Sequence, residues 1–165
     1  MLLFTTQLII RTFICLFIRQ IQSWVANLYY YGNGVEKDLS QAFLWYQKSA
    51  SQGQPYASYA VAQMYSKGEY VTKDDDSAQQ HYMQAISGFL NLELKEQVDE
   101  NLFYKIGMMY KNGLGTDMDI SKAIEYFKRS ADNKWSSYQL GKLFLLGADG
   151  LEKDKEKAVQ WLTKS

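Results

Sequence analysis

The chain has 165 residues, enough for one domain with a buried core, and its 18 Lys plus Arg balance its 18 Asp plus Glu. A formal net charge of zero argues against nucleic acid as a direct ligand, because phosphate binding leaves a basic excess or a basic stripe. One cysteine, Cys15, and one histidine, His81, exclude a disulfide framework and a zinc site built from several Cys and His ligands.

Residues 1–20 are strongly apolar and carry none of the repeats found further along. As a signal peptide they lack an early basic region and an A-x-A-like cleavage site. As a membrane-spanning helix they place Arg11 near the middle, at a cost of ~2.5 kcal/mol or more. As a leading helix they have to bury Leu8, Ile9, Phe13, Leu16 and Phe17 against the first repeat. A fourth interpretation is a mistaken gene start, and the residues leave all four open.

From about Ile21 onwards, one pattern occurs four times, centred on Gly32, Gly68, Gly113 and Gly147. Three residues before each glycine stands an aromatic residue, six before a small one, and seven before an aliphatic one. After each glycine, an Asp precedes an Ala by four residues: Asp38/Ala42, Asp74/Ala78, Asp119/Ala123 and Asp154/Ala158. The glycine-to-alanine distance is ten residues in three copies and eleven in the fourth.

Each copy predicts two helices joined by a turn. The apolar positions before the glycine share one helical face, and the small residue among them permits close approach of a neighbouring helix. The glycine suits the left-handed position that ends a helix, and the Asp suits the N-cap of the next. One such hairpin cannot bury its apolar side alone, so neighbouring hairpins have to stack. The predicted fold is therefore an all-α solenoid of about four antiparallel helix pairs.

The second copy is longer than the others, with 45 residues from Ala78 to Ala123 against 36 and 35 for the other intervals. We expect its second helix to continue for about two and a half extra turns through residues 87–100. This extension would lengthen the apolar face with Phe89, Leu90, Leu92 and Leu94.

The pattern resembles the Sel1-like repeat family, a relative of tetratricopeptide repeats. Residues 26–53, ANLYYYGNGVEKDLSQAFLWYQKSASQG, follow the family pattern of a G-x-G-V turn, an Asp and a later Trp-Tyr pair. The resemblance covers roughly residues 21–165 and implies a right-handed superhelix of antiparallel helix pairs that binds proteins or peptides and is not generally catalytic. No cofactor is expected. We expect repeats at about 21–53, 54–98, 99–133 and 134–165. Residues 85–116 also resemble repeats that follow the nuclease domain in plasmid-mobilisation relaxases.

Sites of chemistry are weakly indicated. His81 occupies a position that holds Trp45, Tyr126 or Trp161 in the other copies, so a packing role is expected. The acidic run around Asp74 suits a helix N-terminus better than a metal or acid–base site. The glycine pairs of the turns lack the spacing and the Lys-Ser/Thr of a phosphate loop. We therefore predict no catalytic, metal or cofactor site.

The predicted binding surface is formed by outward positions of the first helix of each pair, which generally lines the concave side of such a stack. Positions one, five and eight before the turn glycine offer amide, aromatic, Met and Lys side chains. The candidate partner-contacting residues are Trp24, Asn27, Tyr31, Gln63, Lys67, Lys105, Met108, Asn112, Gln139 and Lys142.

The predicted function is a non-enzymatic bacterial scaffold or adaptor that holds a protein or peptide in this groove. The alternative is the detached C-terminal repeat region of a larger plasmid-mobilisation or signalling protein. The last copy ends at Ser165 without a polar capping helix, so its face around Trp161 is expected to meet a further repeat, a partner or a second copy. A cytoplasmic location is expected, with membrane contact, anchoring or export only through residues 1–20.

Overall fold

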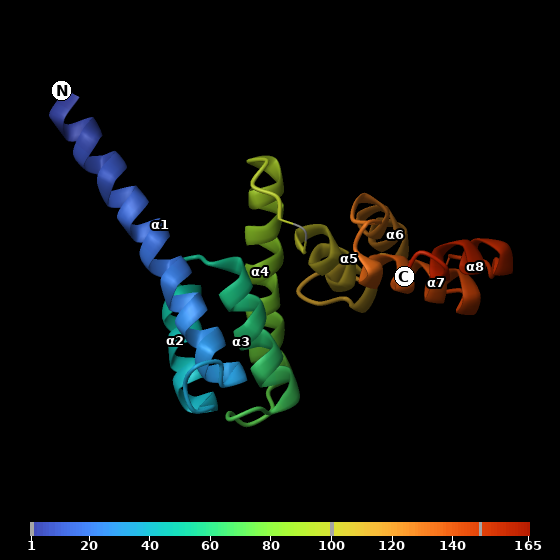
Figure 1. Cartoon of the computed structure of the whole chain (residues 1–165), viewed down its shortest axis with the longest axis horizontal. Coiled ribbons are helices and arrows are strands. Elements are labelled where there is room, and N and C mark those ends of the chain that lie inside the picture. Colours follow the sequence, from blue (N-terminus) through green and yellow to red (C-terminus); the bar gives the residue numbers. More distant parts are fainter. Residues whose placement is uncertain (1, 100, 149) are drawn as a thin grey trace. The chain divides into compact units, whose positions relative to one another are not determined.

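The computed structural model describes residues 2–99, 101–148 and 150–165, and the side chains of residues 2–13 and of Leu16 lie outside this description. Helices account for nearly all of its regular structure, and the described residues contain one isolated β-bridge, between Ala148 and Leu151. The helices are α1 (Leu2–Tyr31), α2 (Leu39–Ser51), α3 (Pro55–Lys67), α4 (Asp75–Leu94), α5 (Leu102–Asn112), α6 (Ile120–Arg129), α7 (Lys134–Leu146) and α8 (Lys155–Leu162). The all-α prediction is confirmed (Figure 1).

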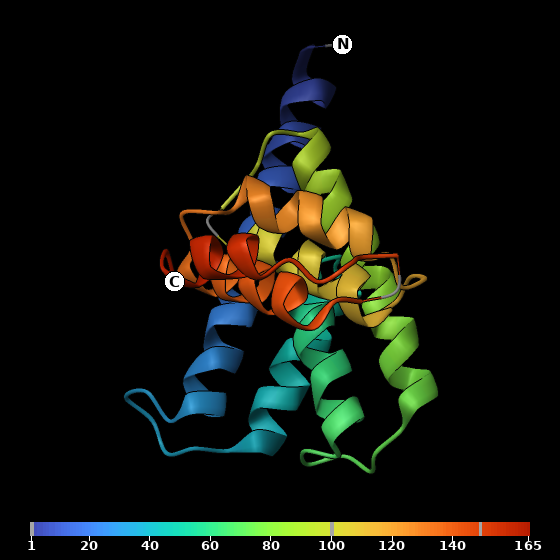
Figure 2. The same ribbon diagram turned by 90° about the vertical axis from the view of Figure 1, so that its right-hand side faces the viewer.

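The chain divides into two compact units, residues 1–88 and 89–165, and the division falls within α4. We call α1, α3, α5 and α7 the A helices, and α2, α4, α6 and α8 the B helices. In the first unit, the A and B helices stand side by side with the α1–α2 and α3–α4 turns at the same end (Figure 2). In the second unit, α5 packs on α6, α6 on α7, and α7 on α8.

The turn glycines end the A helices as the sequence predicts in three of the four copies. Gly68, for example, has φ 69° and ψ 33°, a left-handed conformation in which its N–H reaches back to the carbonyls of Met64 and Tyr65. Gly147 differs, because its ψ is 173°. The fourth turn contains one additional residue, and the Ala148–Leu151 bridge accommodates it, so the left-handed cap predicted for Gly147 is wrong.

An aspartate caps each B helix. The Asp38 carboxylate accepts hydrogen bonds from the N–H groups of Ser40 and Gln41 at 2.9 and 3.1 Å. Equivalent bonds are made by Asp74, Asp119 and Asp154 at the starts of α4, α6 and α8. These bonds satisfy N–H groups that have no partner within the helix, so the predicted caps are confirmed.

Small residues let the paired helices approach closely. A Cβ added to Gly107 would lie 2.7 Å from a ring carbon of Phe127, and one added to Gly141 would lie 2.5 Å from Leu162. The corresponding residue in the first copy, Ala26, is completely buried. Larger side chains at these positions would separate the two helices of a pair.

The inward aromatic residues form the core of each unit. In the first unit, Phe43 meets Tyr65 edge to face, with 5.5 Å between ring centroids. In the second unit, Phe127 and Phe144 are buried, and Tyr110 stacks on Tyr126 at 5.8 Å. The expectation that Tyr110 and Phe144 point inward is confirmed.

Helix α4 has 20 residues, whereas the other B helices have 13, 10 and 8, so it is the longest B helix, but it ends at Leu94 and does not continue through residue 100 as expected. Phe89 is fully buried, but Leu94 is 83% exposed, so its predicted place on the apolar face is wrong. Leu94 is the last residue of α4 and faces solvent where the helix ends. The extension instead contributes a polar contact, because Glu93 accepts a hydrogen bond from the Tyr126 hydroxyl at 2.9 Å and pairs with Arg129.

Helix α1 continues without interruption through residues 20 and 21. Phe17 is 65% exposed, so the burial that the leading-helix interpretation requires is not met at this residue, while Leu8, Ile9, Phe13 and Leu16 lie outside the described side chains. Of the described helices, none combines the length and apolar character that crossing a membrane requires.

Candidate partner-binding surface

The ten predicted contact residues all remain at least partly accessible. The exposed ones are Trp24, Asn27, Tyr31, Lys67 and Asn112, and the partly buried ones are Gln63, Lys105, Met108, Gln139 and Lys142. Neighbouring positions on the same helices, such as Val61, Ile106 and Leu140, are completely buried. The A helices therefore separate a core side from an accessible side, as the repeat pattern predicts.

The strongest grouping of polar side chains lies between α5 and α7 in the second unit. The Lys111 ammonium donates a hydrogen bond to Oε1 of Gln139 at 2.5 Å, which joins the two A helices. Lys142 lies one helical turn beyond Gln139, and its Nζ is 5.6 Å from the centre of the Tyr138 ring. We call the accessible residues Lys105, Met108, Lys111, Gln139 and Lys142 the α5–α7 face.

The α5–α7 face is electropositive. Burial, and then the neighbouring charge of Lys142, lowers the pKa of Lys111. The pKa of Lys105 is lowered by burial, with the Asp99 carboxylate opposing the shift. In the described part of the chain, neither Lys111 nor Lys142 forms a salt bridge. Two like charges that repel each other, of which Lys111 alone is bound to the Gln139 oxygen, favour a ligand that brings negative charge.

In the first unit, several polar side chains of the A-helix surface are already engaged within the fold. Asn27 accepts a hydrogen bond from the Tyr46 hydroxyl at 2.6 Å, and Lys67 pairs with Glu69 at 3.6 Å. Glu69 also accepts a bond from the Tyr30 hydroxyl at 2.7 Å. Burial and this bond raise the pKa of Tyr30 to about 12. The Tyr30–Glu69 bond holds α1 against the turn that follows α3, and the Tyr46–Asn27 bond holds it against α2.

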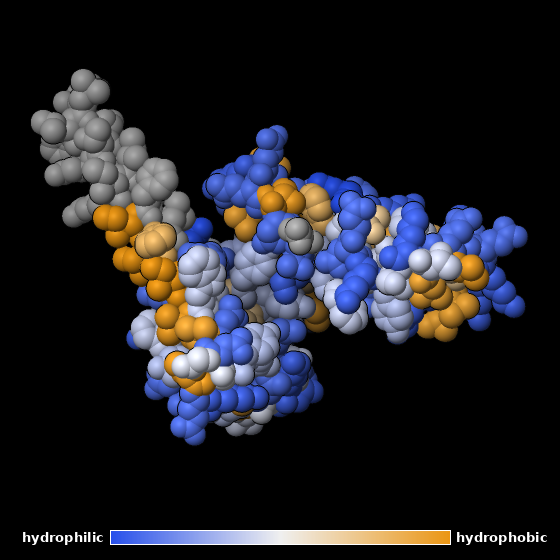
Figure 3. Space-filling view, in the orientation of Figure 1, coloured by the Kyte–Doolittle hydropathy of each residue, from blue (hydrophilic) through white to orange (hydrophobic). Residues whose placement is uncertain are grey.

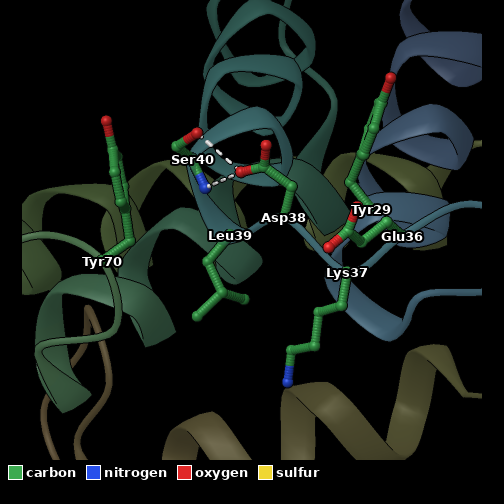
Figure 4. A pocket seen from close by; sticks show the side chains of 7 residues that line it. All are labelled: Tyr29, Glu36, Lys37, Asp38, Leu39, Ser40 and Tyr70. Atoms are coloured by element: carbon green, nitrogen blue, oxygen red, sulfur yellow. Dashed lines mark hydrogen bonds between the residues drawn. The ribbon is translucent and has the colours of Figure 1, made fainter.

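Each unit has a hollow on the surface of its described residues. The first, about 620 Å³, lies at the α1–α2 turn between Tyr29 and Tyr70 (Figure 4). Its carboxylate, Asp38, is occupied by capping α2, so it is poorly suited to acid–base chemistry. The second, about 710 Å³, lies beside Trp135 and Arg129, and the Arg129 guanidinium stacks 4.0 Å above the Phe103 ring.

His81 stacks on Tyr65 with 5.9 Å between ring centroids and an interplanar angle of 10°. Burial lowers the pKa of His81, and its buried Nδ1 has no hydrogen-bond partner. The ring thus fills the flat aromatic position predicted from the other copies. Within the described residues, no three His, Cys, Asp or Glu side chains gather as ligands for a metal ion.

Comparison with known proteins agrees with this register of helices, caps and turns. The family model of the Sel1 repeat matches residues 22–54, 55–88, 104–134 and 136–165. The chain belongs to the Sel1 repeat family. The Sel1-repeat-containing protein YjcO of Escherichia coli strain K12 is 33% identical over 141 residues, which are 81% of this chain and 58% of YjcO.

The fold agrees with a solved member of the Sel1 repeat family. The crystal structure of a Sel1 repeat protein from Oxalobacter formigenes superimposes with a TM-score of 0.62 and 28% identity, covering 88% of this chain and 55% of that protein. The chain spans just over half the length of the curated relatives that it matches. Sel1 repeats are in general protein-interaction units and not typically enzymes, so the α-solenoid class and the general type of partner follow from membership.

Sequence reasoning missed Lys111, because it sampled positions one, five and eight before each Sel1 turn glycine and Lys111 stands two before Gly113. The other copies hold Tyr30, Ser66 and Leu145 at this position, so the repeat gives no rule for it. A comparison of charged residues that vary between copies could have identified it.

Proposed function

We propose that this chain is a non-enzymatic scaffold whose A helices bind a protein segment, and that the α5–α7 face binds carboxylate side chains of that segment. The observation that carries the proposal is the pair of lysines, Lys111 and Lys142, which flank Gln139 and form no salt bridge with any acidic residue that the structure describes. A carboxylate placed there would be attracted by both ammonium groups, and Gln139 could donate an amide hydrogen bond to it.

Apolar groups on the same face would supply the remaining contacts. Met108 is a flexible, polarizable side chain that adapts to different partners, and Tyr138 is 40% exposed next to Lys142. Gln63 and Lys67 occupy the corresponding outward positions on α3, and Asn112 follows Lys111 at the end of α5. We propose Asn112 as a further contact of the α5–α7 face, and Gln63 and Lys67 as contacts of the first unit taken by itself.

Fluorescence polarisation with labelled short peptides tests the proposal. The peptides are matched in apolar content and are net acidic, neutral or net basic. We expect the acidic peptides to bind most tightly and their affinity to fall as salt is added. Lys111→Glu combined with Lys142→Glu should abolish this preference.

The matched control is Lys128→Glu combined with Lys155→Glu, which reverses two exposed lysines on B helices of the same unit. The control proteins should retain the preference for acidic peptides. Equal loss in both double variants would mean that net charge alone governs binding, and the α5–α7 face would then have no special role. The alternative of a detached repeat region of a larger plasmid-mobilisation or signalling protein stays a prediction.

A further inference from the structure

One face of α1 carries a continuous line of large apolar side chains that point to solvent. We call this line the α1 stripe and define it as Ile14, Phe17, Ile21, Trp24, Leu28 and Tyr31, which are 38–65% exposed. An orange band of hydrophobic residues runs along α1 in Figure 3. Monomeric proteins rarely leave so continuous an apolar surface uncovered.

Two of the six stripe positions are buried in every other copy. Ile21 and Leu28 stand eleven and four residues before the turn glycine. The residues at those two positions of the other A helices are at most 5% exposed: Ala57, Met64, Leu102, Met109, Ser136 and Leu143.

The helices that cover these positions are known in two cases. Met64 packs in the same core cluster as Phe43 of α2. Ser136 at the start of α7 forms a buried hydrogen bond with Ser130 at the end of α6, with 2.7 Å between the two Oγ atoms. In both cases the preceding B helix covers the A helix. By analogy, we expect the stripe on α1 to pack against another helix.

The spacing and length of the stripe indicate which helix covers it. Its residues alternate by three and four, the a and d positions of a heptad, with Ile14, Ile21 and Leu28 at a. From Ile14 to Tyr31 the stripe extends about 26 Å, at 1.5 Å per residue. The last B helix, α8, has eight residues and extends only about 12 Å, so it covers less than half of the stripe.

The flanks of the stripe carry no charge that would oppose pairing with an identical helix. The e positions are Ile18 and Val25, and the g positions are Gln20 and Asn27. Arg19 lies on the opposite side, where its guanidinium donates hydrogen bonds to the carbonyls of Gln52 and Gly53 at 3.2 and 3.3 Å. An identical helix therefore meets only apolar and amide groups.

The exposed area is also close to that of a stable dimer. With about 200 Å² for each large apolar side chain, the six stripe residues expose roughly 600 Å². A standard protein interface buries about 800 Å² on each partner. We propose that the α1 stripe is a self-association surface, on which α1 of a second copy of this chain packs to form a two-fold symmetric dimer.

Sedimentation equilibrium of the whole chain over a wide concentration range tests the proposal. We expect the wild type to reach twice its 19.1 kDa mass and to dissociate on dilution. Ile21→Glu combined with Leu28→Glu should shift the mass to 19.1 kDa. Leu94→Glu combined with Val159→Glu, which changes two apolar residues that are 83% and 60% exposed elsewhere, should leave the dimer intact.

Circular dichroism melting checks that the stripe variant is still folded, and cysteine cross-linking locates the contact. In a Cys15→Ser background, Trp24→Cys should give a disulfide-linked dimer on mild oxidation, whereas Lys128→Cys should not. A monomeric wild type at the highest concentration overturns the proposal, and so does a dimer that survives Ile21→Glu with Leu28→Glu. A monomer that binds anionic lipid vesicles through the stripe also overturns it, in favour of a membrane surface. None of these outcomes depends on the α5–α7 face, so the two proposals are tested separately.

Discussion

The close contact between α5 and α6 allows a quantitative prediction for Gly107→Ala. A new Cβ at residue 107 would lie 2.7, 2.8 and 3.2 Å from three ring carbons of Phe127. Carbon atoms in contact prefer about 3.5–4.0 Å, so one of the two helices has to shift by several tenths of an ångström. Phe127 is completely buried, and the packed core around it restricts how far its ring can move.

Two effects of opposite sign determine the net change in the free energy of unfolding. In an unobstructed helix, replacement of Gly by Ala stabilises by about 1 kcal/mol. Overpacking of a well-packed core costs about 1–3 kcal/mol. Because the clash involves the rigid body of an aromatic ring, we expect overpacking to win and the substitution to destabilise the chain by about 1 kcal/mol.

Urea unfolding followed by circular dichroism measures this change, and a double-mutant cycle identifies its cause. Phe127→Leu shortens the side chain that would clash, at a cost of its own. In that background Gly107→Ala should become neutral or stabilising, with a coupling energy of about 1 kcal/mol or more. If Gly107→Ala stabilises the wild type by about 1 kcal/mol, as in an exposed helix, the close-approach argument is refuted.

Three further predictions concern the aromatic position, the caps and the extended helix. His81→Phe should raise stability by about 1 kcal/mol because it removes a buried Nδ1 without a partner. Burial lowers the pKa of His81, so the unfolded chain binds a proton on this residue more readily than the folded chain does. The stability of the wild type should therefore fall as the pH drops below 6.5, the ordinary pKa of histidine. Thermal melts at neutral and mildly acidic pH should show that His81→Phe removes this loss. Asp119→Ala should lower the melting temperature, and Asp119→Asn should lower it much less, because the amide oxygen still accepts a hydrogen bond from the Lys122 N–H. The same bond lowers the pKa of Asp119 in the folded chain. The stabilisation by the carboxylate should therefore be complete above pH 3.8, the ordinary pKa, and be lost as the pH falls through the lower pKa of the folded state. Phe89→Ala should cost about 3–5 kcal/mol in urea unfolding, whereas Leu94→Ala should stay within about 0.5 kcal/mol, and similar costs for both would contradict the assigned burial.

The features that the sequence predicts correctly are those with a local physical cause. Asp38, Asp74, Asp119 and Asp154 satisfy N–H groups within three residues, so their role follows from sequence position alone. The role of the small residue six positions before each turn glycine also follows from the sequence, because a neighbouring helix can approach closely only where a side chain is short. Fold class, helix pairs and caps therefore follow from the pattern.

The features that the sequence does not predict depend on contacts outside the local pattern. Leu94 fits an apolar series, but α4 ends at that residue and its side chain meets solvent. The conformation of Gly147 depends on how one additional residue is placed in its turn, and the pairing of Lys111 with Gln139 depends on the offset between α5 and α7. A repeat pattern specifies which face of a helix is apolar, but it does not specify these offsets.

The repeat architecture also indicates where information about a partner can lie. Positions such as those of Met64, Met109 and Leu143 are fixed by packing, so substitutions there change stability before they change recognition. The position eight residues before the turn glycine holds Trp24, Ala60, Lys105 or Gln139, and none of these is fully buried. Because this position stays partly accessible in every copy, its chemistry can differ from copy to copy. Charge reversal at the varying positions should therefore alter partner choice at nearly constant melting temperature, whereas Ile21 and Leu28 belong to the fixed class and should report on helix association.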